Sequence, residues 1–281
     1  MSVFVTGSLH LDVVLRAPHL PQRDETVAGS AVDYVFGGKG GNQAVAAARM
    51  GADVGLAGRI GADRFGEMIR DALVAGGVDI AQLQQDDGAS GMSAAIVDDR
   101  GEYGAVIVSA ANLRIDPDAI TITAETKLLL LQNEVPEAVN LAVAQQVREV
   151  GAAVWLNAAP ARPLSPQMMA AIDLLIVNRI EAAFYADVMP EAQVLTTLGV
   201  DGVSHNGATY PAYAVDVVST HGAGDMFVGA LASQVAAGTP LKAAIPFAQA
   251  AAALHVSLPT AARDTLTPDM VHRFIAAQSS R

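Results

Sequence analysis

The segment Thr220-His221-Gly222-Ala223-Gly224-Asp225 stands directly before a predicted helix and combines small residues with one carboxylate. Small residues let backbone N–H groups converge, and the helix N-terminus adds partial positive charge, so the turn could hold a phosphate. Asp225 lies where the helix dipole favours an ionised carboxylate, which can accept the proton of an attacking hydroxyl. An ordinary glycine turn with an aspartate cap has the same pattern, so both interpretations stay open at this point.

A second glycine-rich segment, Gly37-Gly38-Lys39-Gly40-Gly41-Asn42-Gln43, also precedes a predicted helix. It is not a Walker A loop, because no Ser or Thr follows the lysine, and its spacing departs from the dinucleotide fingerprint. The glycines would permit close approach of a ligand, and Lys39 and Asn42 could donate hydrogen bonds to its hydroxyl groups. A flexible turn is the alternative.

Polar side chains follow several predicted strands at the point where each strand ends. Open parallel sheets bind ligands at the carboxyl ends of their strands, so we expect these side chains to share one site. Any one of them alone could be a cap or a solvated loop residue. They are His10 and Asp12, Asn133 and Glu134, and Asn178 and Glu181, and the next strand is closed by Thr197 and Gly199.

The elements that must position these residues alternate as strand, glycine, helix, glycine and strand. This alternation predicts an α/β fold, a doubly wound and mostly parallel sheet with helices on both faces. The predicted strands are one ending at Gly7 and Ser8, then 54–57, 128–131, 154–156, 174–177 and 194–198. The predicted helices are 42–50, one around 65–73, 139–150, one starting at Ser165 and Pro166, 225–237 and 241–254.

Two stretches break this rhythm. Residues 13–36 alternate in character without a helical period, and residues 92–108 indicate two strands around a turn at 98–101. We expect both to form one small β-sheet projecting from the main domain. A further hairpin turn is predicted at Asn206-Gly207.

The amino-acid composition limits the classes of function that this chain can have. The 281 residues carry 17 basic and 29 acidic side chains, a net charge of −12, which argues against a nucleic-acid partner. Apolar residues make up 52% and charged residues 16%, so the chain can bury a large core as one large domain or two small ones. The absence of cysteine excludes disulfides and thiolate sites. With no targeting segment and no stretch long enough for a bilayer, we expect a soluble, cytoplasmic protein without a membrane partner.

Several segments, in this order and spacing, resemble the ribokinase-like (pfkB-type) sugar kinase family nearly from end to end. They are GSLHLD (7–12), FGGKGGNQAVAAA (36–48), GRIGADRFG (58–66), LLLQNEVP (129–136), LNAAPAR (156–162), VNRIEA (177–182), TLGVDG (197–202) and HGAGDMFVGAL (221–231). The resemblance implies a large α/β domain, residues 1–10, 37–91 and 109–281, with a β-sheet lid, residues 11–36 and 92–108. It also implies ATP-dependent phosphorylation of a primary hydroxyl of ribose or a ribose-like furanose.

The resemblance further implies roles for individual residues. It makes Asp225 the catalytic base, with an anion hole at Gly222, Ala223 and Gly224. The matched sugar positions are His10, Asp12, Gly38, Lys39, Asn42 and Glu134. Asn178 and Glu181 match a motif that organises Mg²⁺ and phosphate, mostly through water. The matched nucleotide positions are Asn178, Thr197, Gly199, Gly202 and Gln249, the last at the adenine pocket.

Departures from the family pattern matter for the substrate and for ions. His10 stands where members usually have asparagine in the sugar pocket, which counts against ribose itself. Ser219 replaces an aspartate that often helps to hold a monovalent cation, and residues 259–263 lack the glycines usual in the other half of that cation site. Both changes argue against potassium activation.

The stretch 178–197 is about one helix shorter than usual, which would bare a sheet face for a subunit or a neighbouring helix to cover. The family often dimerises through the lid, so we expect a homodimer. Within the fold, the alternatives are a nucleoside or pseudouridine kinase and a kinase for another sugar or sugar acid. From another class, a non-catalytic sugar- or nucleotide-binding protein stays open.

Overall fold

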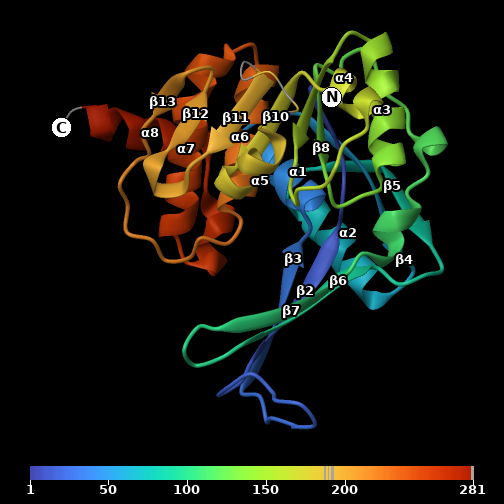
Figure 1. The fold of residues 1–281 in the computed structure, drawn as a ribbon, viewed down its shortest axis with the longest axis vertical. Helices are drawn as coiled ribbons and strands as arrows, with labels where there is room; N and C mark the ends of the chain where they lie inside the picture. Colours follow the sequence, from blue (N-terminus) through green and yellow to red (C-terminus); the bar gives the residue numbers. More distant parts are fainter. Residues whose placement is uncertain (187, 189, 191–192, 280–281) are drawn as a thin grey trace.

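The computed structural model describes residues 1–186, 188, 190 and 193–279 and is built on one large sheet (Figure 1). Nine strands lie in the order β13-β12-β11-β10-β9-β8-β1-β4-β5. The strands from β5 to β11 pair in parallel, and β12 and β13 add an antiparallel edge. Their bounds are β1 Val3–Thr6, β4 Val54–Gly61, β5 Asp79–Asp86, β8 Leu128–Gln132, β9 Ala153–Asn157, β10 Leu174–Asn178, β11 Val194–Thr197, β12 Val203–His205 and β13 Ala208–Tyr210.

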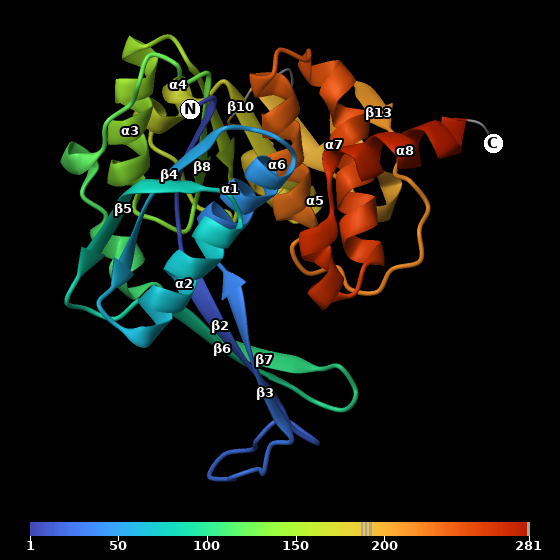
Figure 2. The ribbon, with the colours of Figure 1, turned by 180° about the vertical axis from the view of Figure 1, so that it is seen from behind.

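Helices cover both faces of this sheet because its central strands are apolar on both sides. On β1, Val3 and Val5 belong to one buried cluster, whereas Phe4 belongs to the other. The first cluster packs under α1 (Lys39–Arg49), α2 (Arg64–Ala75), α6 (Ala223–Ala236), α7 (Leu241–Ser257) and α8 (Pro268–Ser279), several of which come forward in Figure 2. The second packs under α3 (Glu137–Glu149), α4 (Pro166–Ala171) and α5 (Arg179–Tyr185).

A second, four-stranded sheet projects away from the main body (Figure 1). Its order is β3-β2-β6-β7, with β2 at His10–Arg16, β3 at Ala31–Gly37, β6 at Gly91–Val97 and β7 at Tyr103–Val108. β2 pairs antiparallel with β3 and parallel with β6, so the two irregular stretches of the sequence form one sheet, which we call the lid. The expected fold class, an α/β sheet with helices on both faces and a separate small sheet, is confirmed.

Several elements with weak hydrophobic patterns were not predicted from the sequence. β5 lies at the sheet edge and carries mixed, half-exposed side chains (DIAQLQQD), so it has no buried run to signal it. Short 3₁₀ turns follow the lid, η1 at Ala110–Arg114 and η2 at Pro117–Ala119, and η4 (Gly199–Asp201) and η5 (Thr260–Thr265) lie further along the chain. In the part of the chain that the structure describes, no helix is long and apolar enough to cross a membrane.

The stretch 178–197 lies partly outside the described residues, which exclude 187, 189, 191 and 192. Its described part contains α5, whose Tyr185 packs in the same cluster as Leu175 and Val177 of β10. This face of β10 is therefore covered within the chain. The exposed apolar side chains are instead on the helix itself, where Ile180 is 81% and Phe184 50% accessible.

Candidate active site

Asp225 lies where the N-terminal ends of α6 and α1 meet. Its Oδ1 accepts a hydrogen bond from Gln43 Nε2 at 2.9 Å, and its Oδ2 accepts one from Asn42 Nδ2 at 3.2 Å. The helix that carries Asp225 begins at Gly222, whose φ of 74° belongs to the left-handed region that favours glycine. The fold thus brings together two sequence motifs that lie about 180 residues apart.

The surroundings of Asp225 tune its proton affinity. Desolvation raises the pKa of this carboxyl, and the charge of Lys39 and the hydrogen bonds from Gln43 and Asn42 oppose that rise without cancelling it. The nearby Glu134 adds to the increase. A carboxylate with a raised pKa is a stronger proton acceptor, and the amide bonds fix its orientation.

A chain of buried amides supports this carboxylate. Gln43 Nε2 donates to Asn157 Oδ1 as well as to Asp225, while Gln132 Nε2 donates to Gln43 Oε1, each at 2.9 Å. Both glutamines are fully buried. No role was predicted for Gln43, Gln132 or Asn157. The sequence did offer one signal: Gln43 is a polar residue within an alanine-rich helix that must be largely buried. A buried polar group needs a hydrogen-bond partner, so this position could have been singled out.

The predicted sugar-binding residues lie around the start of the lid. Glu134 Oε2 accepts hydrogen bonds from the Lys39 backbone N–H at 2.9 Å and from the Ser8 hydroxyl. Asp12, on β2, accepts one from Ser93 Oγ of β6 at 2.6 Å. Ser8 and Ser93 were also missed, since an isolated serine carries no spacing signal.

His10 begins β2 and is only 4% accessible, with a buried Nε2 that has no hydrogen-bond partner. The residue at its side is Gly91, where an added Cβ would lie 2.5 Å from the His10 ring. The imidazole is therefore packed tightly at the junction of lid and main sheet.

The glycines of the 37–41 segment face protein. A Cβ on Gly38 would lie 2.7 Å from the Ser8 carbonyl oxygen, and one on Gly40 would lie 2.6 Å from the Gly7 carbonyl carbon. The absence of side chains at Gly38 and Gly40 lets α1 approach the end of β1. Their role beside a ligand stays a prediction. Gly224 differs, since nothing lies within 4 Å of its Cβ position.

A cavity of about 180 Å³ adjoins Asp225. Eight predicted site residues line it: Lys39, Asn178, Glu181, Thr197, Gly222, Ala223, Gly224 and Asp225. The other predicted residues lie outside its lining, namely His10, Asp12, Gly38, Asn42, Glu134, Gly199, Gly202 and Gln249. The structure therefore gathers the predicted phosphate, metal and base positions around one cavity.

Two residues of the predicted nucleotide set are engaged with β13 (Ala208–Tyr210). Gln249 Nε2 donates to the Tyr210 carbonyl at 2.9 Å, and a Cβ on Gly202 would lie 1.9 Å from the same oxygen. Of the predicted anion-hole residues, Ala223 has its N–H bonded to the Thr220 carbonyl at 3.2 Å. The hydrogen bond of Gln249 holds the segment at Tyr210 in place. The bond of the Ala223 N–H removes this group from the donors predicted for the anion hole.

Asn178 and Glu181 form a capping box at the start of α5. The Asn178 side chain accepts from the N–H groups of Ile180 and Glu181, and Glu181 Oε2 accepts from the Asn178 N–H at 2.8 Å. No cluster of three or more metal-ligating His, Cys, Asp or Glu side chains occurs within the described ranges. Glu181 places a carboxylate at the cavity wall. This suits Mg²⁺, which keeps several waters and takes its other ligands from substrate phosphates.

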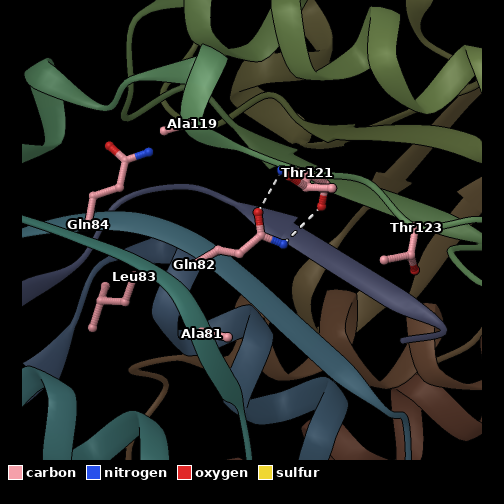
Figure 3. Close-up of a pocket in the computed structure, with 7 residues that line it drawn as sticks. All are labelled: Ala81, Gln82, Leu83, Gln84, Ala119, Thr121 and Thr123. Atoms are coloured by element: carbon pink, nitrogen blue, oxygen red, sulfur yellow. Dashed lines mark hydrogen bonds between the residues drawn. The ribbon is translucent and has the colours of Figure 1, made fainter.

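A larger hollow of about 400 Å³ lies against the edge strand β5, between it and residues 119–123 (Figure 3). The Gln82 side chain accepts from the Thr121 N–H and donates to the Thr121 carbonyl, so it pairs with this segment as a neighbouring strand would. No ionisable side chain lines this hollow. Of these two cavities, only the smaller one has ionisable side chains in its lining.

Comparison with known proteins agrees with this geometry. Residues 1–268 match the model of the pfkB family carbohydrate kinases. The chain is 34% identical over 271 residues to the ribokinase of Bacillus subtilis (strain 168), covering 91% of this chain and 92% of that protein. It is 32% identical over 280 residues to the ribokinase of Haemophilus influenzae, covering 90% and 91%.

Solved structures give the same result. A ribokinase from Thermotoga maritima superposes with a TM-score of 0.88 at 26% identity, over 98% of this chain and 99% of that one. The Arabidopsis thaliana ribokinase, whose structure is a complex with ribose and ATP, superposes with a TM-score of 0.89 at 26% identity, over 98% of both chains. The family match covers nearly the whole sequence, and the chain belongs to the pfkB family of carbohydrate kinases, phosphotransferases with an alcohol group as acceptor.

Proposed function

We propose that this kinase transfers the γ-phosphate of ATP to a primary hydroxyl of ribose or a ribose-like furanose. The observation that carries the proposal is the raised-pKa carboxylate of Asp225, oriented by Gln43 and Asn42 at the mouth of a cavity lined by the start of α6. The ribose and ATP bound by the similar Arabidopsis ribokinase support the choice of substrates.

In the proposed reaction, Asp225 accepts the proton of the sugar hydroxyl as that oxygen attacks the γ-phosphorus. The bond from this phosphorus to the bridging oxygen of ADP breaks, and ADP leaves with the electron pair. Backbone N–H groups at Gly222 and Gly224 face the negative charge on the transferred group, at a helix N-terminus whose dipole has the matching sign. The hydroxyl is positioned by Asp12, Asn42 and Glu134, and lid closure would exclude competing water.

The proposed nucleotide site lies beside the same cavity, starting at Thr197 in its lining. Thr197 and Gly199 would border the phosphates and ribose of ATP, with Gly202 and Gln249 behind them. Mg²⁺ would be held by Glu181 and Asn178, largely through water, and it supplies positive charge to the phosphates when bound. Lys39 adds a fixed cation at the same cavity.

The acceptor is the finer part of the proposal. His10, tightly packed at the lid junction, differs from the asparagine expected for a ribose pocket, and this difference favours testing nucleosides and other sugars beside ribose. We also expect a homodimer that forms through the lid, where Tyr103, Val106 and Ile107 of β7 are between 61% and 72% accessible. A cytoplasmic location remains our expectation for this cysteine-free chain.

A coupled assay of ADP release tests the proposal, with Mg-ATP and a panel of pentoses, hexoses, sugar acids, nucleosides and pseudouridine. Ribose turnover that disappears in Asp225→Asn, with nucleotide binding retained, is the expected result. Preference for a nucleoside or another sugar would replace the acceptor and keep the chemistry. Turnover that persists in Asp225→Asn would overturn the role of this carboxylate.

A further inference from the structure

Arg263 is a buried arginine without an acidic partner. It lies on η5, is 5% accessible, and takes part in none of the ion pairs formed among the described residues. Arginine is almost never fully buried unless its charge is compensated, so this position needs an explanation. Burial lowers the pKa of Arg263, but a guanidinium remains protonated at any pH a protein experiences.

Backbone carbonyls take the place of a carboxylate. Arg263 Nη2 donates to the Ser219 carbonyl at 2.8 Å, Nη1 donates to the His221 carbonyl at 2.9 Å, and Nε lies 3.4 Å from the Leu258 carbonyl. The planar guanidinium spans two carbonyls of one loop, which a single point charge could not do with the same geometry. The arginine therefore acts on the loop 219–221 and on little else.

That loop leads directly into the start of α6. His221 precedes Gly222, the N-cap of the helix, and its carbonyl also accepts from His255 Nε2 at 3.0 Å. Burial lowers the pKa of His255 to about 4, so at neutral pH the ring is uncharged and uses its one N–H for this carbonyl. The N–H groups of Val218 and Ser219 donate to the Val256 carbonyl. These bonds hold the loop in place directly before the start of α6.

The same place is where the family resemblance puts a monovalent cation, between Ser219 and residues 259–263. Carbonyl oxygens are suitable ligands for an alkali cation, but those of Ser219 and His221 already accept from Arg263. A second positive charge beside a buried guanidinium would be strongly repelled, since the interior screens charge poorly. The residues present therefore do not fit a bound potassium ion.

We propose that Arg263 is a built-in cation, a positioning residue that holds the loop before Gly222 and makes the enzyme independent of monovalent cations. This inference rests on the proposed kinase function. Removing the guanidinium should free the Ser219 carbonyl and one lone pair of the His221 carbonyl, which keeps its bond from His255, so that a small cation from solution can take its place. The loss of Arg263 would then create a cation dependence that the wild-type protein lacks.

The test measures kcat and KM with and without potassium, at constant ionic strength balanced by tetramethylammonium. Wild type should not respond. Arg263→Ala should lose up to about a hundredfold in kcat, because a small displacement of the start of α6 misplaces the phosphate donors, with a smaller change in the KM of the acceptor. Potassium or dilute guanidinium should restore part of that loss. Arg49→Ala is the matched control, since Arg49 contacts the neighbouring Asp264 at 2.5 Å but neither loop carbonyl.

A thermal melt separates this inference from the proposed function. Potassium should raise the Tm of Arg263→Ala relative to tetramethylammonium and should leave wild type unchanged, whether or not any acceptor is phosphorylated. If Arg263→Ala does not fold, Arg263→Met, which keeps much of the side-chain volume without the charge, takes its place and should show the same potassium dependence. Potassium stimulation of wild type, wild-type kcat in folded Arg263→Ala, or no potassium response in that variant would each overturn the proposal. Silence across all acceptors, with the melting result as expected, would instead count against the proposed function.

Discussion

Two glycine-rich helix starts meet at Asp225, and they use glycine in opposite ways. Before α1, Gly38 and Gly40 lie against the backbone that follows β1, with Cβ positions 2.6–2.7 Å from its atoms. Before α6, Gly224 faces open space and Gly222 has only the His255 ring nearby, 3.1 Å from its Cβ position. The first segment closes the protein on itself, whereas the second keeps room for a ligand.

The difference shows that a glycine cluster at a helix N-terminus is not by itself an anion site. At α1 the glycines set the position of side chains, because they bring Lys39, Asn42 and Gln43 to the end of the sheet and against Asp225. At α6 the backbone around Gly224 remains accessible. Arg263 and His255 hold the preceding loop by hydrogen bonds to the His221 carbonyl. One start supplies positioned side chains, and the other exposes main chain beside the cavity.

The largest effect is expected at the α6 start. Asp225→Asn should lower kcat by about 10³-fold, because general-base catalysis contributes on the order of 10²–10⁴. The same variant should raise the Tm at neutral pH. Desolvation raises the pKa of folded Asp225, so the ionised carboxylate costs stability, and that cost is absent below the unfolded pKa of about 4. Melting curves at pH 7 and pH 4 check the sign, and an equal Tm difference at both would contradict it.

A matched pair of alanines compares the two starts directly. Gly40→Ala should destabilise by about 1–3 kcal/mol or more, since its Cβ would overlap backbone at 2.6 Å. Gly224→Ala should leave the free energy of unfolding within about 1 kcal/mol, since nothing lies nearby, and should lower kcat by crowding the phosphate. Denaturant unfolding and steady-state kinetics measure both. The comparison fails if Gly224→Ala is the more destabilised variant.

Residues at the start of α1 should affect catalysis by orienting the Asp225 carboxylate. Gln43→Leu removes the hydrogen bond to Asp225 and those to Asn157 and Gln132. We expect kcat to fall by roughly tenfold, less than the ~10²–10⁴ of a general base, because Gln43 orients the base and does not accept the proton. The KM for ATP should change little. Gln82→Leu, far from the cavity, provides a control for a lost amide pair. An unchanged kcat in Gln43→Leu would remove this residue from the catalytic support.

The smallest effect is a shift along the pH axis. The acid limb of kcat/KM should have its midpoint above the ordinary aspartate value of about 4, because desolvation raises the pKa of Asp225 and activity needs the ionised form. Gln43→Leu should move the midpoint higher still, since the bond it removes lowers that pKa. Initial rates across pH 4–8 with a constant-ionic-strength buffer measure both, and a midpoint below 4 would contradict the assignment.

Much of the architecture follows from local pattern alone. Runs such as Leu128–Leu131 and Leu174–Val177 are typical of strands buried on both faces, and helices with glycine stops separate them. Asn206-Gly207 predicts its hairpin because only such residues fit the turn. By contrast, the polar edge strand β5 had no pattern to reveal it, and its neighbours in space define it.

Periodicity, glycine placement and motif order are properties of the chain, so the fold class, the family and the residue types that carry the chemistry could be predicted from them. What those residues contact depends on the folded arrangement. It set Gln43 and Asn157 around Asp225, packed Gly38 and Gly40 against the backbone that follows β1, and placed Arg263 on the carbonyls of Ser219 and His221. These contacts join residues up to 182 positions apart, so no local pattern encodes them. The physical reason is that burial removes water, and each buried polar group must then find its partner across the fold.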